Sequence, residues 1–372
     1  MKHKLNHGLR KLMRKRVGLR RAAIGLLTVI GQRAVILRLA VIAAACMAAC
    51  LLLAGTQGQQ QSEAPKPIDL LKHKIEEIGR GVSADWGIYV KSLDTGEELA
   101  INADTAMDTM STIKVPLLVD VYRLVDAGKL NTADRIVMTT ADKRFGTGVL
   151  RTLDDGLNLS FRDALELMII QSDNTGTDMA FARVGGPAHV TATMRQLGLD
   201  SITATGTSFE WFRALGANAD PAWNNLSPEE LFRRGFPRTM TDADTERFHF
   251  EGKHPFGLSS ARDMGRILEM IARNQAASQK SCEEMMRILR QQQMRTRIPK
   301  YLDNVSAPHK TGDFPPYIAN DVGFLETDNG RVVVVFFSAH HRGYYSELED
   351  AIARMSEQVW AYFNYRGKTA SN

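Results

Sequence analysis

The stretch MSTIKVP (residues 110–116) places the hydroxyl of Ser111 three residues before the amine of Lys114. Apolar residues follow with a helical period until Gly128, so this stretch opens a predicted helix over residues 111–127. Side chains at positions i and i+3 share one face of a helix, so the two groups can meet. A serine hydroxyl becomes a nucleophile when a base takes its proton, and a desolvated neutral lysine is such a base. The pair is therefore a candidate nucleophile and base, although on its own this spacing more often marks a solvated surface pair.

Two tripeptides further along the chain support the interpretation of that pair as nucleophile and base. The sequence SDN (residues 172–174) lies between predicted helices over residues 161–170 and 177–184. The sequence KTG (residues 310–312) ends a predicted strand over residues 305–310. Each tripeptide alone is typical of a surface loop or a strand end. All three motifs in this order and in these contexts indicate a single active site.

The predicted strands lie at both ends of the folded part of the chain. Residues 86–91 and 98–101 form a predicted hairpin near the start. Residues 319–327 and 331–339 form another near the end, joined by the turn sequence DNG. A predicted helix over residues 346–365 follows, and the other predicted helices lie between the hairpins. A single α+β domain whose sheet is assembled from both ends fits this order better than two tandem domains.

The set S-x-x-K, S-D-N and K-T-G is the signature of class A β-lactamases and penicillin-binding proteins. From about Ile68 to Tyr365 the chain resembles this family, and the class A branch most closely. The resemblance implies a β-lactamase/transpeptidase-like α+β fold, with an antiparallel five-stranded sheet flanked by helices and an all-helical subdomain. It also implies a serine hydrolase that opens the β-lactam amide through an acyl-serine intermediate.

The resemblance gives each motif residue an expected role. Ser111 attacks the carbonyl carbon, Lys114 serves as base or proton relay, and Ser172 passes a proton to the leaving nitrogen. The backbone N–H groups of Ser111 and Asp313 form the oxyanion hole. The expected substrate-binding residues are Asn174, Lys310, Thr311, Gly312 and Asp313, the last through its backbone N–H.

The chain departs from the family pattern at two places. Class A enzymes remove the acyl group with a glutamate about 35 residues after S-D-N, and here Glu210 is the only acid at that distance. The family's flanking pattern is absent, so Glu210 is either the deacylating base or a solvated loop residue. Asp313 directly follows K-T-G, where a carboxylate repels an anionic substrate unless it points away. Many class A enzymes hold an extra arginine nearby, and Arg342 is the candidate for that position in this chain.

An enlarged loop over residues 206–255 is rich in aromatic residues. These side chains are expected to form a small satellite core under the loop. The competing hypothesis is a lid that shapes substrate choice.

The charge of the chain is divided unequally. Residues 1–38 contain eleven Lys and Arg and no acid, which leaves a net charge of −6 for the remainder. A mildly acidic folded part argues against a nucleic-acid-binding face. The three cysteines and nine histidines show no metal-binding spacing, so no metal and no other cofactor is expected.

The N-terminal region reads as a targeting segment. We expect a basic cytoplasmic region at residues 1–33, a signal anchor or signal peptide at 34–55 and a linker at 56–67. The hydrolase domain follows at residues 68–366, with a short tail at 367–372. Translation could begin at Met1 or Met13. These features predict a monomeric exported bacterial protein that residues 34–55 anchor to the inner membrane, with its catalytic domain in the periplasm or on the extracytoplasmic face.

Two other functions use the same acylation chemistry. One is a D-alanyl-D-alanine peptidase or transpeptidase that acts on peptidoglycan, so the partner is either a small β-lactam or a cell-wall peptide. The other is a membrane-anchored penicillin sensor that becomes acylated and does not turn over.

Overall fold

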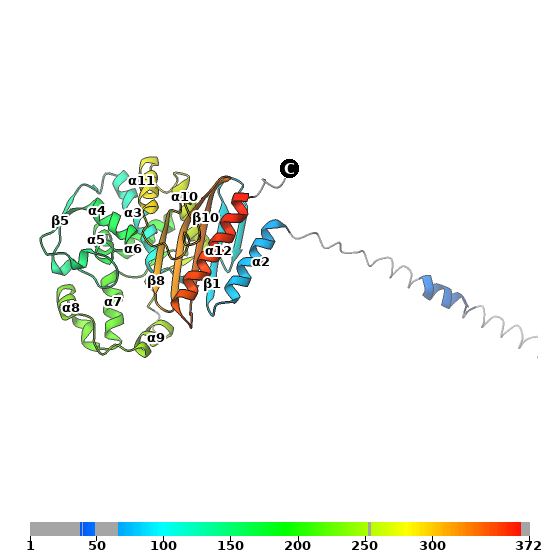
Figure 1. Cartoon of the computed structure of the whole chain (residues 1–372), viewed down its shortest axis with the longest axis horizontal. Coiled ribbons are helices and arrows are strands. Elements are labelled where there is room, and N and C mark those ends of the chain that lie inside the picture. The colour runs from blue at the N-terminus through cyan, green and yellow to red at the C-terminus, as the bar shows by residue number, and fades with distance from the viewer. Residues whose placement is uncertain (1–37, 39, 49–65, 252–253, 366–372) are drawn as a thin grey trace, which may run out of the picture. The chain divides into compact units, whose positions relative to one another are not determined.

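The chain divides into two compact units, Met1–Ala64 and Pro65–Asn372. The computed structural model describes residues 38, 40–48, 66–251 and 254–365. Most of the expected targeting segment therefore lies outside the described residues. Within the described ranges, no helix is both long enough and apolar enough to cross a bilayer. The second unit contains all the motifs identified from the sequence (Figure 1).

A five-stranded antiparallel sheet forms the centre of the second unit, with strand order β2-β1-β10-β9-β8. Strands from the two ends of the unit meet where β1 pairs with β10, from Asp85↔Ala339 to Ser92↔Val332. The bounds are Asp85–Ser92 (β1), Glu98–Ile101 (β2), His309–Phe314 (β8), Ile318–Thr327 (β9) and Gly330–Ala339 (β10). This arrangement confirms the predicted α+β fold class and both predicted hairpins.

The central strand β10 buries both of its faces. Val332, Val334 and Phe336 pack on one face with the helices α2 and α12. Val333 and Val335, with Phe337, join the larger core on the other face. Because successive side chains in a strand point to opposite faces, the unbroken apolar run of this strand requires cover on both sides.

Helices supply that cover, as Figure 1 shows. The helices α2 (Pro67–Arg80) and α12 (Tyr345–Tyr365) pack together on one face of the sheet. The other helices form the body that carries the first two motifs. They are α3 (Lys114–Asp126), α4 (Phe161–Ile170), α5 (Asn174–Val184), α6 (Pro187–Gln196), α10 (Ala261–Ala272) and α11 (Gln279–Arg290).

Short strands complete the framework. They are β3 (Ala106–Asp108), β6 (Thr203–Ala204) and β7 (Gly257–Ser260), which pair in the order β3-β7-β6, together with the pair β4 (Arg135–Val137) and β5 (Asn158–Ser160).

Several elements differ from the predictions. The nucleophile stretch begins as a 3₁₀ turn, η1 (Met110–Ile113), and the α-helix α3 starts only at Lys114. Strand β8 starts at His309, so the K-T-G motif lies inside the strand and not at its end. The helices α2, α10 and α11 were not predicted.

The enlarged loop is mostly helical. It contains α7 (Ser208–Ala217), η4 (Pro221–Asn225), α8 (Pro228–Arg234) and α9 (Asp242–Phe250). Its aromatic rings pack as expected, for example where Phe145 stacks on Trp223 and on Phe232. The prediction of a separate satellite core is incomplete, because Trp211 and Phe248 of this loop are part of the main core.

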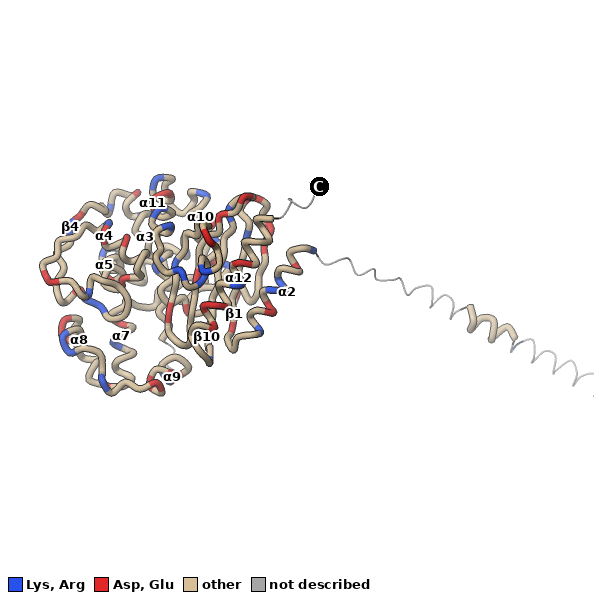
Figure 2. The backbone as a smooth tube through the Cα atoms, viewed as in Figure 1, with Lys and Arg blue, Asp and Glu red and all other residues tan. Residues whose placement is uncertain are grey.

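Basic and acidic residues are interspersed over the described part of the second unit (Figure 2). No long stripe of one sign is visible along the backbone in that view.

Candidate active site

Asp108, at the end of strand β3, holds the turn that carries Ser111 in place. Met110 has a φ of 44°, a left-handed conformation that non-glycine residues rarely adopt. The Asp108 carboxylate accepts a hydrogen bond from the Met110 N–H at 2.9 Å. Burial raises the pKa of Asp108 to about 7, although hydrogen bonds from the Met110, Gly257 and Phe256 N–H groups oppose the rise. Ser111 itself is partly exposed.

Lys114 is completely buried and its amine contacts the S-D-N motif. Its Nζ donates to the Ser172 carbonyl oxygen at 2.7 Å, to Ser172 Oγ at 3.0 Å and to Asn174 Oδ1 at 2.9 Å. Burial lowers the pKa of Lys114 well below its ordinary value, and the nearby charge of Lys310 lowers it further. The lowered pKa favours the uncharged amine, which is the form that a general base requires.

The S-D-N loop is fixed by its own second residue. Asp173 caps helix α5 by accepting from the Gly176 N–H at 3.0 Å, and its other carboxylate oxygen accepts from the Leu150 N–H at 2.9 Å. These contacts hold Ser172 at a φ of 56°. The strained conformation points the Ser172 hydroxyl toward both lysines of the site.

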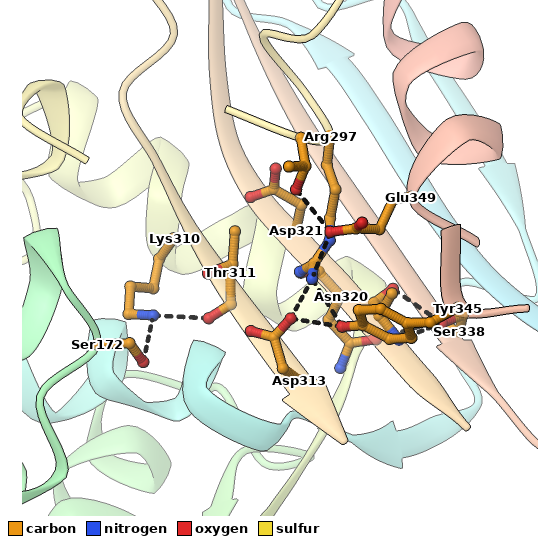
Figure 3. A network of polar contacts seen from close by, with 12 residues as sticks. Ser172, Arg297, Lys310, Thr311, Asp313, Asn320, Asp321, Ser338, Tyr345 and Glu349 are labelled. Carbon is orange, nitrogen blue, oxygen red and sulfur yellow. Dashed lines mark hydrogen bonds and ion pairs between the residues drawn. The ribbon is translucent and has the colours of Figure 1, made fainter. Parts of the chain in front are cut away.

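Lys310 reaches the same hydroxyl from strand β8. Its Nζ lies 2.9 Å from Ser172 Oγ and donates to the Thr311 carbonyl oxygen at 2.7 Å (Figure 3). Burial lowers the pKa of Lys310 to about 7. The Ser172 hydroxyl therefore bridges two buried amines whose pKa values are both lowered, an arrangement that suits a proton shuttle.

Gly312 brings strand β8 against the nucleophile turn. A Cβ atom at this position would lie 2.6 Å from the Thr109 carbonyl oxygen and 3.1 Å from the Ser111 nitrogen. Only glycine allows this approach. Gly312 was expected among the substrate-binding residues, and the contact that the structure shows is with the backbone around Ser111.

A cavity of about 400 Å³ opens over Ser111. Asn174 and Asp313 line it together with apolar side chains of the enlarged loop, including Trp211, Phe212 and Leu215. The Ser208 hydroxyl is buried and lacks a hydrogen-bond partner in the described structure. The Thr311 hydroxyl is also buried without a partner, so it can donate to a ligand.

Residues 70–363 match the family model described as the beta-lactamase enzyme family. The chain belongs to this family. It is 22% identical to "Beta-lactamase VEB-1" of Pseudomonas aeruginosa over 79% of this chain and 91% of that protein. It is 29% identical to "Extended-spectrum beta-lactamase PER-1" of the same organism, over 43% of this chain and 52% of that protein.

Solved structures of the family share the fold. A beta-lactamase from Sphaerobacter thermophilus is similar with a TM-score of 0.61 and 27% identity, over 77% of this chain and 94% of that one. A mutant of PBP-A, solved as an acyl-enzyme complex with penicillin G, has a TM-score of 0.63 and 23% identity, over 80% of this chain and 97% of that one. A β-lactamase-type hydrolase is thus the family-level function.

Glu210 lies outside the cavity of this family member. Its side chain is exposed and is not among the groups that line the cavity over Ser111. Its carboxylate accepts from the Thr207 N–H at 2.8 Å, and the Thr207 hydroxyl accepts from the Glu210 N–H at 3.2 Å. This reciprocal pair is a capping box at the start of helix α7.

Arg297 was missed in the sequence, where Arg342 was suggested instead. Arg342 is exposed and pairs with Glu246 at 2.7 Å. Arg297 is fully buried and forms an ion pair with Asp313. No local sequence pattern marks Arg297, since its importance depends on the position of β8 in three dimensions.

No group of three or more potential metal ligands is found among the described residues.

Proposed function

We propose that this protein is an exported serine hydrolase that opens the β-lactam amide through an acyl-enzyme at Ser111. The observation that carries the proposal is the Ser172 hydroxyl, which is hydrogen-bonded to both Lys114 and Lys310. Such a bridge can move a proton from one side of a reacting amide to the other.

The first step forms the ester. Uncharged Lys114 takes the Ser111 proton while Ser111 Oγ bonds to the carbonyl carbon, and the N–H groups of Ser111 and Asp313 stabilise the oxyanion. The carbon–nitrogen bond then breaks. Ser172 donates its proton to the leaving nitrogen and is reprotonated by the Lys114 ammonium, so the net result is the transfer of one proton from Ser111 to the nitrogen.

Lys310 and Thr311 hold the substrate carboxylate in this proposal. A charged Lys310 supplies attraction, and the Thr311 hydroxyl, which lacks a partner, supplies a directed hydrogen bond. Asn174 lines the cavity and binds the substrate amide, although its Oδ1 accepts from Lys114 and its Nδ2 donates to the Phe145 carbonyl oxygen at 2.9 Å.

We propose a capping role for Glu210 in place of the deacylating one. Its carboxylate is engaged with Thr207 on the exposed side of α7. Of the described side chains that line the cavity, only Asp313 bears a carboxylate, and that carboxylate is paired with Arg297.

This last observation favours a second candidate function with slow release of the acyl group. A D-alanyl-D-alanine peptidase or transpeptidase, or a penicillin-binding sensor, needs acylation at Ser111 without a strong base for the attacking water. The two candidates differ in the lifetime of the acyl-enzyme and share every earlier step.

Labelling with a fluorescent penicillin tests the acylation step. We expect Ser111→Ala to abolish covalent labelling and the matched surface change Ser346→Ala to leave it intact. Labelling that survives in Ser111→Ala would refute the proposed nucleophile.

Turnover of nitrocefin by the full-length protein separates the two candidates. Rapid turnover supports the β-lactamase, whereas an acyl-enzyme that persists in mass spectra for hours supports the peptidase or sensor.

Export is proposed from the sequence of the N-terminal region alone. The basic residues 1–33 and the apolar residues 34–55 support a signal anchor or a signal peptide. Fusion of alkaline phosphatase after residue 66 tests it, since that enzyme is active only when it is exported.

A further inference from the structure

Arg297 occupies a fully buried position beneath the strand that carries K-T-G. Its Nη1 donates to the Asn320 carbonyl oxygen at 2.7 Å. Its Nη2 contacts the Asp313 carboxylate, the Tyr345 hydroxyl at 2.7 Å and Glu349 at 3.3 Å. The two terminal nitrogens of the guanidinium therefore meet four acceptors (Figure 3), whereas its Nε has no hydrogen-bond partner among the described residues.

Asp313 separates this guanidinium from the cavity over Ser111. The Asp313 side chain lines that cavity and is 26% exposed, whereas Arg297 is 0% exposed and is not part of the lining. Residues two apart in a strand share a face, so Asp313 and Thr311 face the same side of β8. The wall where Thr311 can meet a substrate carboxylate therefore continues into a carboxylate of the protein itself.

The positive charge of Arg297 is already more than offset without a substrate. One guanidinium faces the carboxylates of Asp313 and Glu349. Burial raises the pKa of Asp313, but the charge of Arg297 and the Tyr345 hydroxyl outweigh this effect and lower it overall, so the carboxylate is ionised. A second carboxylate brought by a substrate would meet Asp313 first and would be repelled by it.

We propose that Asp313 is a specificity-determining residue whose carboxylate takes the place beside Arg297 that a substrate carboxylate would otherwise fill. This inference rests on the proposed function at the same site. The Asp313 carboxylate thereby favours acyl substrates whose own carboxylate is esterified or absent. The Lys310–Thr311 pair alone would instead favour substrates with a free carboxylate. Removal of the Asp313 carboxylate opens Arg297 to the substrate and restores a preference for the anion.

A matched pair of ligands tests this selectivity, namely benzylpenicillin and its methyl ester. The second-order acylation rate constant is measured for each ligand, and the result is the acid-to-ester ratio. We expect Asp313→Ser to raise this ratio by about tenfold or more, the scale of one charge-assisted hydrogen bond. Asp313→Asn, which keeps the shape without the charge, should give a smaller rise.

The double variant Arg297→Gln/Asp313→Ser is the control. It removes both members of the ion pair, and the acid-to-ester ratio should return toward that of the unmodified protein. Thermal melting of each variant shows that it is folded. If a variant is unfolded, Asp313→Asn provides the comparison, because the amide retains hydrogen bonding to Arg297.

Equal changes in the acid and ester rates would overturn the inference and leave the proposed function intact. Absence of Ser111-dependent labelling in the unmodified protein would overturn the proposed function instead. In that event, equilibrium binding of the two ligands to Ser111→Ala, with and without Asp313→Ser, still measures the selectivity. An unchanged binding ratio then rejects the role of Asp313.

Discussion

At the scale of single residues, the site contains two lysines whose burial lowers the pKa of both side chains. Both amines contact the Ser172 hydroxyl, and burial is the main cause of both lowered pKa values. In the proposed mechanism, Lys114 acts in its uncharged form and Lys310 in its charged form. The pH range of the proposed reaction therefore depends on how the surroundings of each lysine shift its pKa.

The pH dependence of acylation follows from the pKa of Lys310, which is about 7. Below this value Lys310 is charged and attracts a substrate carboxylate, and above it the attraction is lost. We expect the acylation rate constant of benzylpenicillin to fall relative to that of its methyl ester as the pH rises from about 6 to about 9, a range that brackets this pKa. Stopped-flow measurements across that range test this.

Lys310→Arg is the matched variant for that experiment. Arginine keeps its charge throughout the range, so the relative fall should disappear. Parallel pH profiles for the two ligands in the unmodified protein would contradict the assignment of Lys310 to the carboxylate.

The motif residues could be predicted because their identity and order carry the chemistry. Ser172 and Lys310 are brought together by the fold as expected. The capping box of Glu210 was not predicted, although Thr207-Ser208-Phe209-Glu210 fits its sequence pattern. Arg297 could not be found, because its partners lie at least 16 residues away in the sequence.

At the scale of elements, the start of helix α7 can be tested separately from catalysis. Thr207→Ala removes the hydroxyl that caps the Glu210 N–H, and we expect it to cost about 1 kcal/mol of unfolding free energy. Glu210→Gln keeps the capping pattern, since glutamine serves at this position as well. It should therefore leave both urea stability and nitrocefin turnover unchanged.

A large loss of turnover in Glu210→Gln, without loss of stability, would instead support Glu210 as the deacylating base.

The contact between strand β8 and the turn η1 requires glycine at position 312. An Ala at Gly312 would place its Cβ 2.6 Å from the Thr109 carbonyl oxygen. We expect Gly312→Ala to displace Ser111 and to reduce acylation by about 100-fold or more, since a shift of about 1 Å is enough for such a loss. Penicillin labelling rates measure the effect, and thermal melting serves as the control for folding. Normal labelling would show that the turn can move without harm.

The predicted position of β8 was wrong by several residues, and the reason is physical. Its sequence HKTGDF is almost entirely polar or small, because its side chains serve the site rather than the core. Local sequence rules are expected to fail at such functional segments. By contrast, the apolar run of β10 was predicted to within one residue.

At the scale of the whole molecule, the enlarged loop is an integral part of the core that surrounds the site. Trp223 is fully buried, stacks on Phe145 and packs against Phe236. Phe145 directly precedes Gly146, which lines the cavity over Ser111. The loop therefore links the stability of the fold with the shape of the cavity.

Trp223→Ala should destabilise the protein by about 3 to 5 kcal/mol, the usual cost of a large aromatic deletion in a core. Urea unfolding measures this change. The matched change Phe209→Ala alters a partly buried aromatic of the same loop and should cost less. Equal, small effects of the two changes would show that the loop packs loosely.

The general architecture could be predicted from the two hairpins and the helices between them, but several covering helices could not. Helix α10 begins with the cap Ser260, which accepts from the Asp263 N–H at 3.1 Å. That signal is present in the sequence, yet it is short and follows a loop of unusual length. The small sheets escaped prediction because each of their strands has four residues or fewer.

The pairing of β1 with β10 has a consequence for the way the protein is made. The partner of Asp85 is Ala339, so the central sheet cannot close until nearly the whole chain has left the ribosome. Contacts so distant in sequence form slowly, and a chain that folds late stays extended for longer during synthesis. A polypeptide that must pass through a membrane channel before it folds, as the proposed export requires, gains from this delay. Late closure of the sheet would then keep the chain unfolded for longer and so favour its translocation.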